Sequence, residues 1–186
     1  MELFSFSASG NPLLLSASEN GLFLHSSQNE RFGRPVLLCS SYKNGLSGCV
    51  YNDSLYYAYI NKENSLLLRR LHESVILFRL DSTDNITYHE PRLATFNNTL
   101  FLFYPEETTG VCRLRLRLSD DPPQLPEPFQ AAYPEPPALF LQTTEHYLYL
   151  FLTIEETGFS YRYSKKAGFE PLCPEEEFLS GLRLPW

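Results

Sequence analysis

Hydrophobic side chains recur along the chain in short clusters, each introduced by a polar pair and followed by another polar turn. Four clusters rich in Leu, Phe and Tyr share this arrangement, at residues 20–24, 53–59, 98–104 and 145–151. Aligning Leu22, Leu55, Leu100 and Tyr147 gives spacings of 33, 45 and 47 residues. Periods of this length are typical of architectures built from repeated supersecondary units. The pattern therefore predicts four units, of which the first is short.

The flanks of the clusters are similar as well. Glu90-Pro91-Arg92-Leu93 precedes the third cluster, and Glu135-Pro136-Pro137-Ala138-Leu139 precedes the fourth. After these clusters, residues 106–113 match residues 155–162. We place all the repeats in a single domain over residues 1–186, with a C-terminal tail at 173–186. The approximate repeats are 11–43, 47–82, 90–130 and 135–172.

Within each unit the pattern predicts β-strands. Residues 113–118 alternate Arg and Leu, which places the guanidinium groups on one face of a strand and the leucines on the other. Residues 147–152 are apolar on both faces, as in a strand buried between two layers. Residues typical of hairpin turns separate the runs, at 20–21, 43–45, 97–98 and 109–110.

Residues 63–80 allow two interpretations. Leu68, Leu71, Val75 and Phe78 have helical spacing and no Gly or Pro interrupts the segment, whereas the repeat predicts two strands with a turn at 72–74. A short helix is expected at 174–178, where Pro and acidic residues form a first turn.

A β-rich unit of about 45 residues, repeated four times, resembles a β-propeller. The resemblance covers residues 11–172 and carries no family signature, since the WD dipeptide, the kelch di-glycine and the sialidase-type box are all absent. It implies an all-β fold of four-stranded antiparallel blades, closed alone or completed by self-association. In a closed ring, residues 1–9 would be an outer strand paired with the last blade. A β-sandwich is the alternative fold.

Net charge and cysteine usage limit the classes of partner, the cellular compartment and the cofactors that we expect. Fifteen Lys and Arg face 22 Asp and Glu, for a net charge of −7, which argues against nucleic acid and anionic membranes. Without a basic, apolar leader or a membrane-length apolar run, we expect a cytoplasmic protein with reduced thiols at its four cysteines. No cofactor or metal site is expected, because neither the cysteines nor the histidines have the spacing of a metal-ligand motif. The histidines are His25, His72, His89 and His146.

Two groups of charged residues are candidates for binding or catalysis. Glu90 and Glu135 occupy equivalent positions before presumed inner strands, as the carboxylates of a glycosidase propeller would. Arg113, Arg115 and Arg117 could hold an anionic ligand, or pair with acids on a neighbouring strand. Most tyrosines alternate with leucines, which favours packing between blades.

Neither a nucleophile elbow nor a phosphate-binding loop is present in the sequence. The favoured function is therefore a non-enzymatic interaction or assembly module that binds a protein partner or itself. One alternative is a propeller that binds or hydrolyses carbohydrate through carboxylates at its channel mouth. Another is an incomplete propeller, a fragment or remnant, that is completed by homo-oligomerisation.

Overall fold

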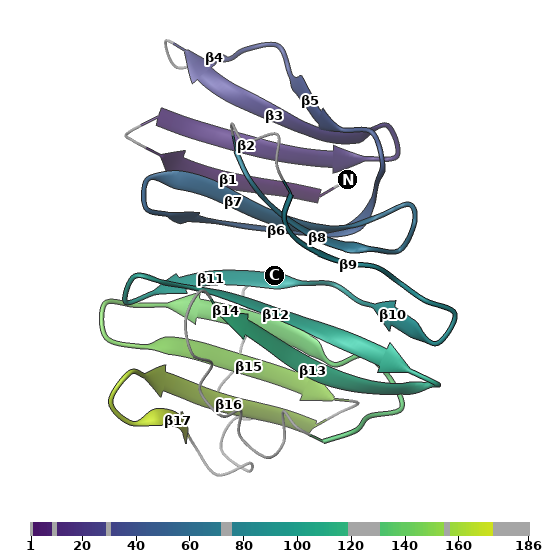
Figure 1. Cartoon of the computed structure of the whole chain (residues 1–186). Coiled ribbons are helices and arrows are strands. Elements are labelled where there is room, and N and C mark those ends of the chain that lie inside the picture. The colour runs from purple at the N-terminus through teal and green to yellow at the C-terminus, as the bar shows by residue number, and fades with distance from the viewer. Residues whose placement is uncertain are drawn as a thin grey trace.

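Every regular element in the described part of the chain is a β-strand, and the strands form four antiparallel sheets (Figure 1). The computed structural model describes residues 2–8, 11–28, 31–71, 76–118, 131–154 and 157–172. The all-β, propeller-like fold predicted from the repeat is confirmed. No helix long and apolar enough to cross a membrane occurs within these ranges.

The first two sheets come from the N-terminal part of the chain. In the first sheet β1, β2 and β3 pair in order, and β4 and β5 both pair with β3. In the second sheet the strands pair in chain order. The strands of these sheets are β1 Glu2–Ala8, β2 Asn11–Ser18, β3 Gly21–Gln28, β4 Arg31–Phe32, β5 Val36–Cys39, β6 Tyr42–Tyr51, β7 Ser54–Asn61, β8 Leu66–Arg70 and β9 Ile76–Leu80.

The third sheet is built around one long strand. This strand, β12, carries β11 and β10 one after the other along one edge and β13 along the other edge. In the fourth sheet the strands again pair in chain order. The strands of these sheets are β10 Ile86–Tyr88, β11 Arg92–Phe96, β12 Thr99–Thr108, β13 Val111–Leu118, β14 Ala138–Thr143, β15 Leu148–Ile154, β16 Thr157–Ser164 and β17 Gly168–Pro171.

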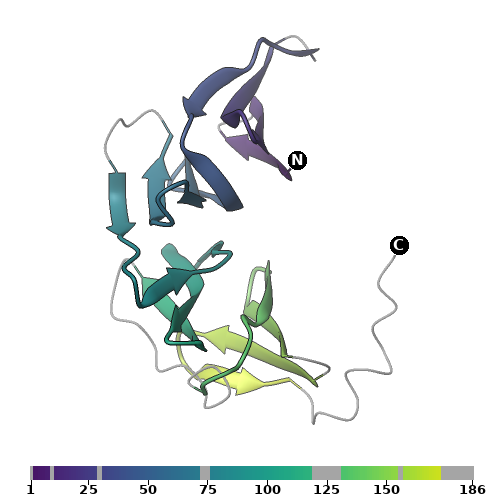
Figure 2. The same cartoon turned by 90° about the vertical axis from the view of Figure 1, so that its right-hand side faces the viewer.

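The sheets follow one another as the blades of an arc (Figure 2). The inner strands are β1, β6, β11 and β14, and consecutive inner strands are neighbours across each joint between blades. The arc is open between the first and the last sheet (Figure 2). The described part of one chain therefore forms four blades of a propeller without closing the ring.

A separate hydrophobic core fills each joint. Strand β7 illustrates why its residues are apolar on both faces: Leu55, Tyr57 and Tyr59 pack toward the first sheet, whereas Ala58 and Ile60 pack toward the third. Strand β12 does the same one joint further along, because its alternate side chains enter the cores on its two sides. Two-sided burial thus follows from stacking of blades.

Two expectations about the start of the chain need correction. Strand β1 pairs with β2 along its whole length, so residues 2–8 are the inner strand of the first sheet and do not pair with the last one. The short spacing between Leu22 and Leu55 follows from the strands in which these two residues lie. Counted outward from the inner strand, Leu22 lies in the third strand of its sheet, β3, whereas Leu55 and Leu100 lie in the second strands of theirs, β7 and β12. The first sheet, expected to be short, has five strands.

The structure also decides between local alternatives. Strands β8 and β9 confirm the strand interpretation of residues 63–80, while the turn at 72–74 and the helix expected at 174–178 lie outside the described residues. Asn97-Asn98 and Thr109-Gly110 form hairpin turns with positive φ at both positions, as expected. The turn expected at residues 43–45 is wrong, since this segment lies within β6 at an irregularity of its register.

Candidate functional site

The inner strands of the second, third and fourth sheets converge around Glu90-Pro91-Arg92. Gly45 in β6 makes this approach feasible, because it has φ of +72° and a Cβ there would lie 2.9 Å from the Pro91 ring and 3.2 Å from the Glu90 Cα. Only glycine combines that backbone conformation with so close a neighbour. The register irregularity in β6 thus brings its backbone against the start of β11.

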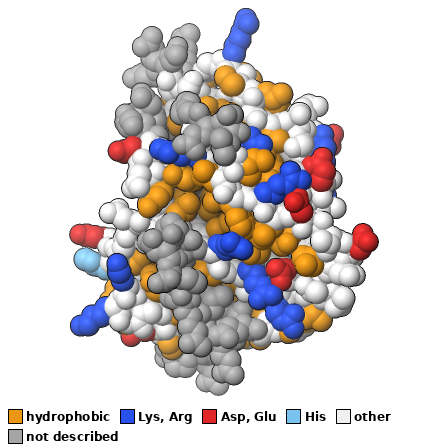
Figure 3. Space-filling view, in the orientation of Figure 1, with side chains coloured by type: hydrophobic (Ala, Val, Ile, Leu, Met, Phe, Trp, Pro, Cys, Tyr) orange, Lys and Arg blue, Asp and Glu red, His pale blue; other side chains and the backbone are white. Residues whose placement is uncertain are grey.

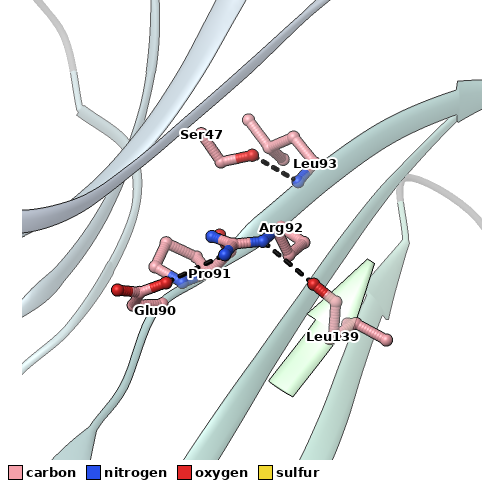
Figure 4. Close-up of polar contacts among 6 residues, drawn as sticks. All are labelled: Ser47, Glu90, Pro91, Arg92, Leu93 and Leu139. Carbon is pink, nitrogen blue, oxygen red and sulfur yellow. Dashed lines mark hydrogen bonds and ion pairs between the residues drawn. The ribbon is translucent and has the colours of Figure 1, made fainter. Parts of the chain in front are cut away.

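Side chains, rather than backbone ladders, join β11 to its neighbouring inner strands β6 and β14 (Figure 4). The Leu93 N–H donates to the Ser47 hydroxyl at 2.9 Å, which links β11 to β6 in a buried setting. On the other side, Arg92 Nε donates to the Leu139 carbonyl at 3.1 Å and so links β11 to β14. The same guanidinium donates to the Pro91 carbonyl at 3.1 Å and to Glu90 Oε2 at 2.8 Å.

A cleft of about 510 Å³ opens beside Arg92. Its polar side chains differ in chemistry and come from different strands, whereas β14 and β15 supply two aromatic rings, Phe140 and Phe151, with centroids 6.0 Å apart. The cleft is lined by Asn44, Tyr88, His89, Glu90, Arg92, Pro105, Pro136, Pro137, Ala138, Leu139, Phe140, Phe151 and Thr153. Aromatic faces beside fixed hydrogen-bonding groups suit a small polar ligand with an apolar side.

A second group of polar side chains lies next to this cleft. His89 Nε2 is 2.9 Å from Glu107 Oε2, and the ligand atoms of His89, Glu107 and Cys112 all lie within 4.8 Å of one another. Burial, together with the charges of Glu107 and Glu135, raises the pKa of the Cys112 thiol. His89 belongs to both groups, because its side chain also lines the cleft.

Sequence reasoning missed the cluster of His89, Glu107 and Cys112, and expected no metal site. The three residues are separated by 18 and 5 positions, which matches no local ligand motif. Sheet register brings them together: Glu107 lies opposite Cys112 on β12 and β13, and the His89 N–H donates to the Pro105 carbonyl on the other edge of β12. Only a correct pairing of the third sheet would have revealed the cluster.

The two carboxylates singled out from the sequence have different surroundings. Glu90 lines the cleft and forms an ion pair with Arg92 at 2.8 Å. Glu135 is exposed, does not line the cleft, and lies close enough to Cys112 to affect its charge state. Their equivalence in the repeat does not place them in one site, so their role as an acid and base pair stays a prediction.

The three arginines of β13 face the joint between the second and third sheets. Arg115 donates twice to Glu106 Oε1 across the strand pair, at 2.8 and 3.1 Å. The Arg117 guanidinium lies over the Phe78 ring of β9, 4.5 Å from its centroid. On the face shown in Figure 3, Lys and Arg side chains lie beside acidic ones around a band of apolar side chains. Arg115 and Arg117 thus have partners within the chain, while anion binding by the trio remains a prediction.

No protein-family model matches the chain, and no curated protein sequence matches it. A solved structure of similar fold is the Aleuria aurantia lectin in complex with Fucalpha1-6GlcNAc, with a TM-score of 0.49 and 10% sequence identity. The match covers 92% of this chain and 60% of the lectin chain, so this chain spans less than two thirds of that protein.

Proposed function

We propose that this chain is a non-enzymatic interaction and assembly module whose open arc is completed by a second copy. The observation that carries the proposal is the position of the exposed large apolar side chains. Among the described residues, Phe32, Val36 and Leu37 lie in the first sheet and Phe140 lies in the last, whereas Leu77 alone lies between the ends. Exposed apolar groups concentrated at two ends of one molecule are typical of association surfaces.

The outward face of the last sheet supports this proposal. The alternate residues of β14 and β15 that enter the third joint are mostly leucines, buried or partly buried, whereas their neighbours on the opposite face include Phe140, which is 62% exposed. The same face carries the Tyr147–Tyr149 ring pair and Arg162, which lies 5.0 Å from the centroid of the Tyr147 ring. Aromatic rings also enter the cores between blades within the arc. This face therefore has the composition of a blade surface that packs against another blade.

A second copy can satisfy both ends at once. If the last sheet of each copy packs against the first sheet of the other, two copies related by a two-fold axis form a closed assembly with no end left over. A partner protein that covers only one end would leave the other exposed. A ring of two copies is therefore the arrangement that we propose.

Light scattering on a sizing column across a dilution series tests the proposal. We expect a mass of twice 21.5 kDa for the native chain. Phe140→Glu, which places a charge on the end face, is expected to give the 21.5 kDa monomer. Leu77→Glu is the matched control, because Leu77 is 44% exposed but lies in β9, away from both ends of the arc. A native monomer at every concentration, or a dimer that Leu77→Glu alone disrupts, would overturn the proposal.

Carbohydrate binding in the cleft is the second candidate. The observation that favours it is the pairing of the Phe140 and Phe151 rings with a guanidinium, a carboxylate, an amide and a hydroxyl from Arg92, Glu90, Asn44 and Thr153. Sugars present an apolar ring face and a rim of hydroxyl groups, so both halves of this lining have a counterpart on the ligand.

Binding to a glycan array tests this candidate, with Glu90→Gln and Glu135→Gln as a matched pair. Glu90 lines the cleft and Glu135 does not, so only Glu90→Gln is expected to lower the affinity for a glycan, by about tenfold. Equal effects of the two substitutions, or no glycan bound by the native chain, would remove this candidate.

A further inference from the structure

We propose that His89, Glu107 and Cys112 form a binding site for a divalent transition-metal ion of the zinc type. The site lies beside the cleft, which His89 also lines, on the face of the third sheet that packs toward the fourth. It offers one imidazole nitrogen, one carboxylate and one thiol, with all ligand atoms within 4.8 Å of one another.

The distances are close to those that such an ion requires. Zinc binds His nitrogen and carboxylate oxygen at about 2.0–2.2 Å and thiolate sulfur at about 2.3 Å, so neighbouring ligand atoms of a tetrahedral site lie about 3.5 Å apart. His89 Nε2 and Glu107 Oε2 are already 2.9 Å apart. The remaining adjustment is within reach of side-chain rotation, without movement of the strands.

The backbone holds the three ligands in register. The His89 N–H donates to the Pro105 carbonyl at 3.0 Å, and Glu107 and Cys112 face each other across the β12–β13 ladder. Cys112 is held from its other side too, since it exchanges backbone hydrogen bonds of 2.8 and 2.9 Å with Tyr133. Ligands fixed on paired strands lose little conformational freedom when an ion binds.

The donor set selects the class of ion. A thiolate, a carboxylate and a neutral imidazole together balance the charge of a divalent cation, and sulfur and nitrogen ligands favour zinc or cobalt over magnesium or calcium. Cys112 is fully buried, whereas the His89 and Glu107 side chains are 28% and 34% exposed, so an ion can enter from the solvent side. Three protein ligands leave a fourth position for water or for a group of a bound molecule.

Titration of the metal-free full-length chain with Co²⁺ and Zn²⁺ tests the proposal. We expect one equivalent of Co²⁺ to bind and to give a thiolate-to-cobalt charge-transfer absorption. This absorption should disappear when Zn²⁺ displaces the Co²⁺. Cys112→Ser should abolish this absorption, and His89→Gln should weaken Zn²⁺ binding by about 100-fold, because a direct ligand contributes at least as much as an outer-shell partner. Cys49→Ser is the matched control. Cys49 packs against the core of the neighbouring joint, so its substitution is expected to leave metal binding unchanged.

Two further measurements distinguish loss of the metal site from loss of the fold. Because Cys112 is buried, its variant is checked by circular dichroism, and Glu107→Gln at a partly exposed position provides an independent loss of affinity. No Co²⁺ or Zn²⁺ bound at about 1 mM, or a cobalt absorption that survives in folded Cys112→Ser, would overturn the site. The oligomer mass is measured separately, so failure of the assembly proposal would not affect this test.

Discussion

The two joints on either side of β11 are bridged by different kinds of side chain. At the β6–β11 joint the Ser47 hydroxyl, 4% exposed, accepts the Leu93 N–H at 2.9 Å, and Thr95 donates to the Val50 carbonyl at 3.2 Å. At the β11–β14 joint the bridge is the long side chain of Arg92, which is one-third exposed and borders a cleft of about 510 Å³. A short hydroxyl closes a joint, whereas a guanidinium connects two strands and leaves space beside them. One repeat can therefore build both a structural contact and a candidate binding site.

The largest expected effect concerns the close approach of β6 to the start of β11. Gly45→Ala should lower the free energy of unfolding by about 3 kcal/mol, because it adds a strained φ and a contact of 2.9 Å with the Pro91 ring. Gly110→Ala is the control. Its φ of +77° is similar but no atom lies within 4 Å of the added Cβ, so we expect a loss of about 1 kcal/mol. Urea unfolding measures both, and equal losses would show that the approach of β6 to Pro91 is not constrained.

Breaking each bridge separately should give a smaller and unequal effect. Ser47→Ala leaves the Leu93 N–H buried without an acceptor, and we expect a loss of about 2 kcal/mol in urea unfolding. Arg92→Gln removes bonds that are partly exposed, and we expect about 1 kcal/mol. If Arg92→Gln proves the more destabilising, the guanidinium is the main fastening of the arc and the contrast between the joints fails.

The smallest expected effect concerns reactivity, and it extends the comparison to the first joint. Burial raises the pKa of Cys49, beside the second joint, to about 12. At Cys39, beside the first joint, burial opposes ionisation, but hydrogen bonds with Ser41 and Tyr59 and the charge of Arg69 together lower its pKa. Cys39 should therefore be alkylated at lower pH than an ordinary thiol, and Cys49 at higher pH. Mass spectrometry after iodoacetamide treatment between about pH 6 and pH 10 measures this order, and equal labelling of the two would contradict it.

Prediction from the sequence was most successful for local features. The Leu and aromatic runs were expected to be strands, and they lie in β3, β7, β12 and β15. Burial on both faces was expected for residues 147–152, but β15 buries one face and only half-buries the other, whereas β7 and β12 are buried on both. The turns at 97–98 and 109–110 were recognisable because Asn and Gly tolerate positive φ. The turn expected at 43–45 failed for a physical reason, since Gly45 has positive φ in order to meet Pro91, which lies in another sheet.

The candidate site was predictable only in part. Glu90 was identified because it precedes an inner strand, and it lines the cleft. His89, Glu107 and Cys112 were not recognised as a group, because their proximity depends on the register of β10 and β13 against the two edges of β12. A register shift of one residue would turn a side chain to the opposite face, and no local pattern reports it.

The sequence by itself determined the class of this protein: repeated strands with Leu and aromatic faces that must be covered by neighbouring sheets. This follows because hydrophobic periodicity and turn chemistry act over a few residues. Only the tertiary structure decided that β1 completes the first sheet, that the four described blades form an open arc, and that Arg92 borders a cleft. These outcomes depend on how sheets far apart in sequence pack together, and the energies involved arise only when those surfaces meet.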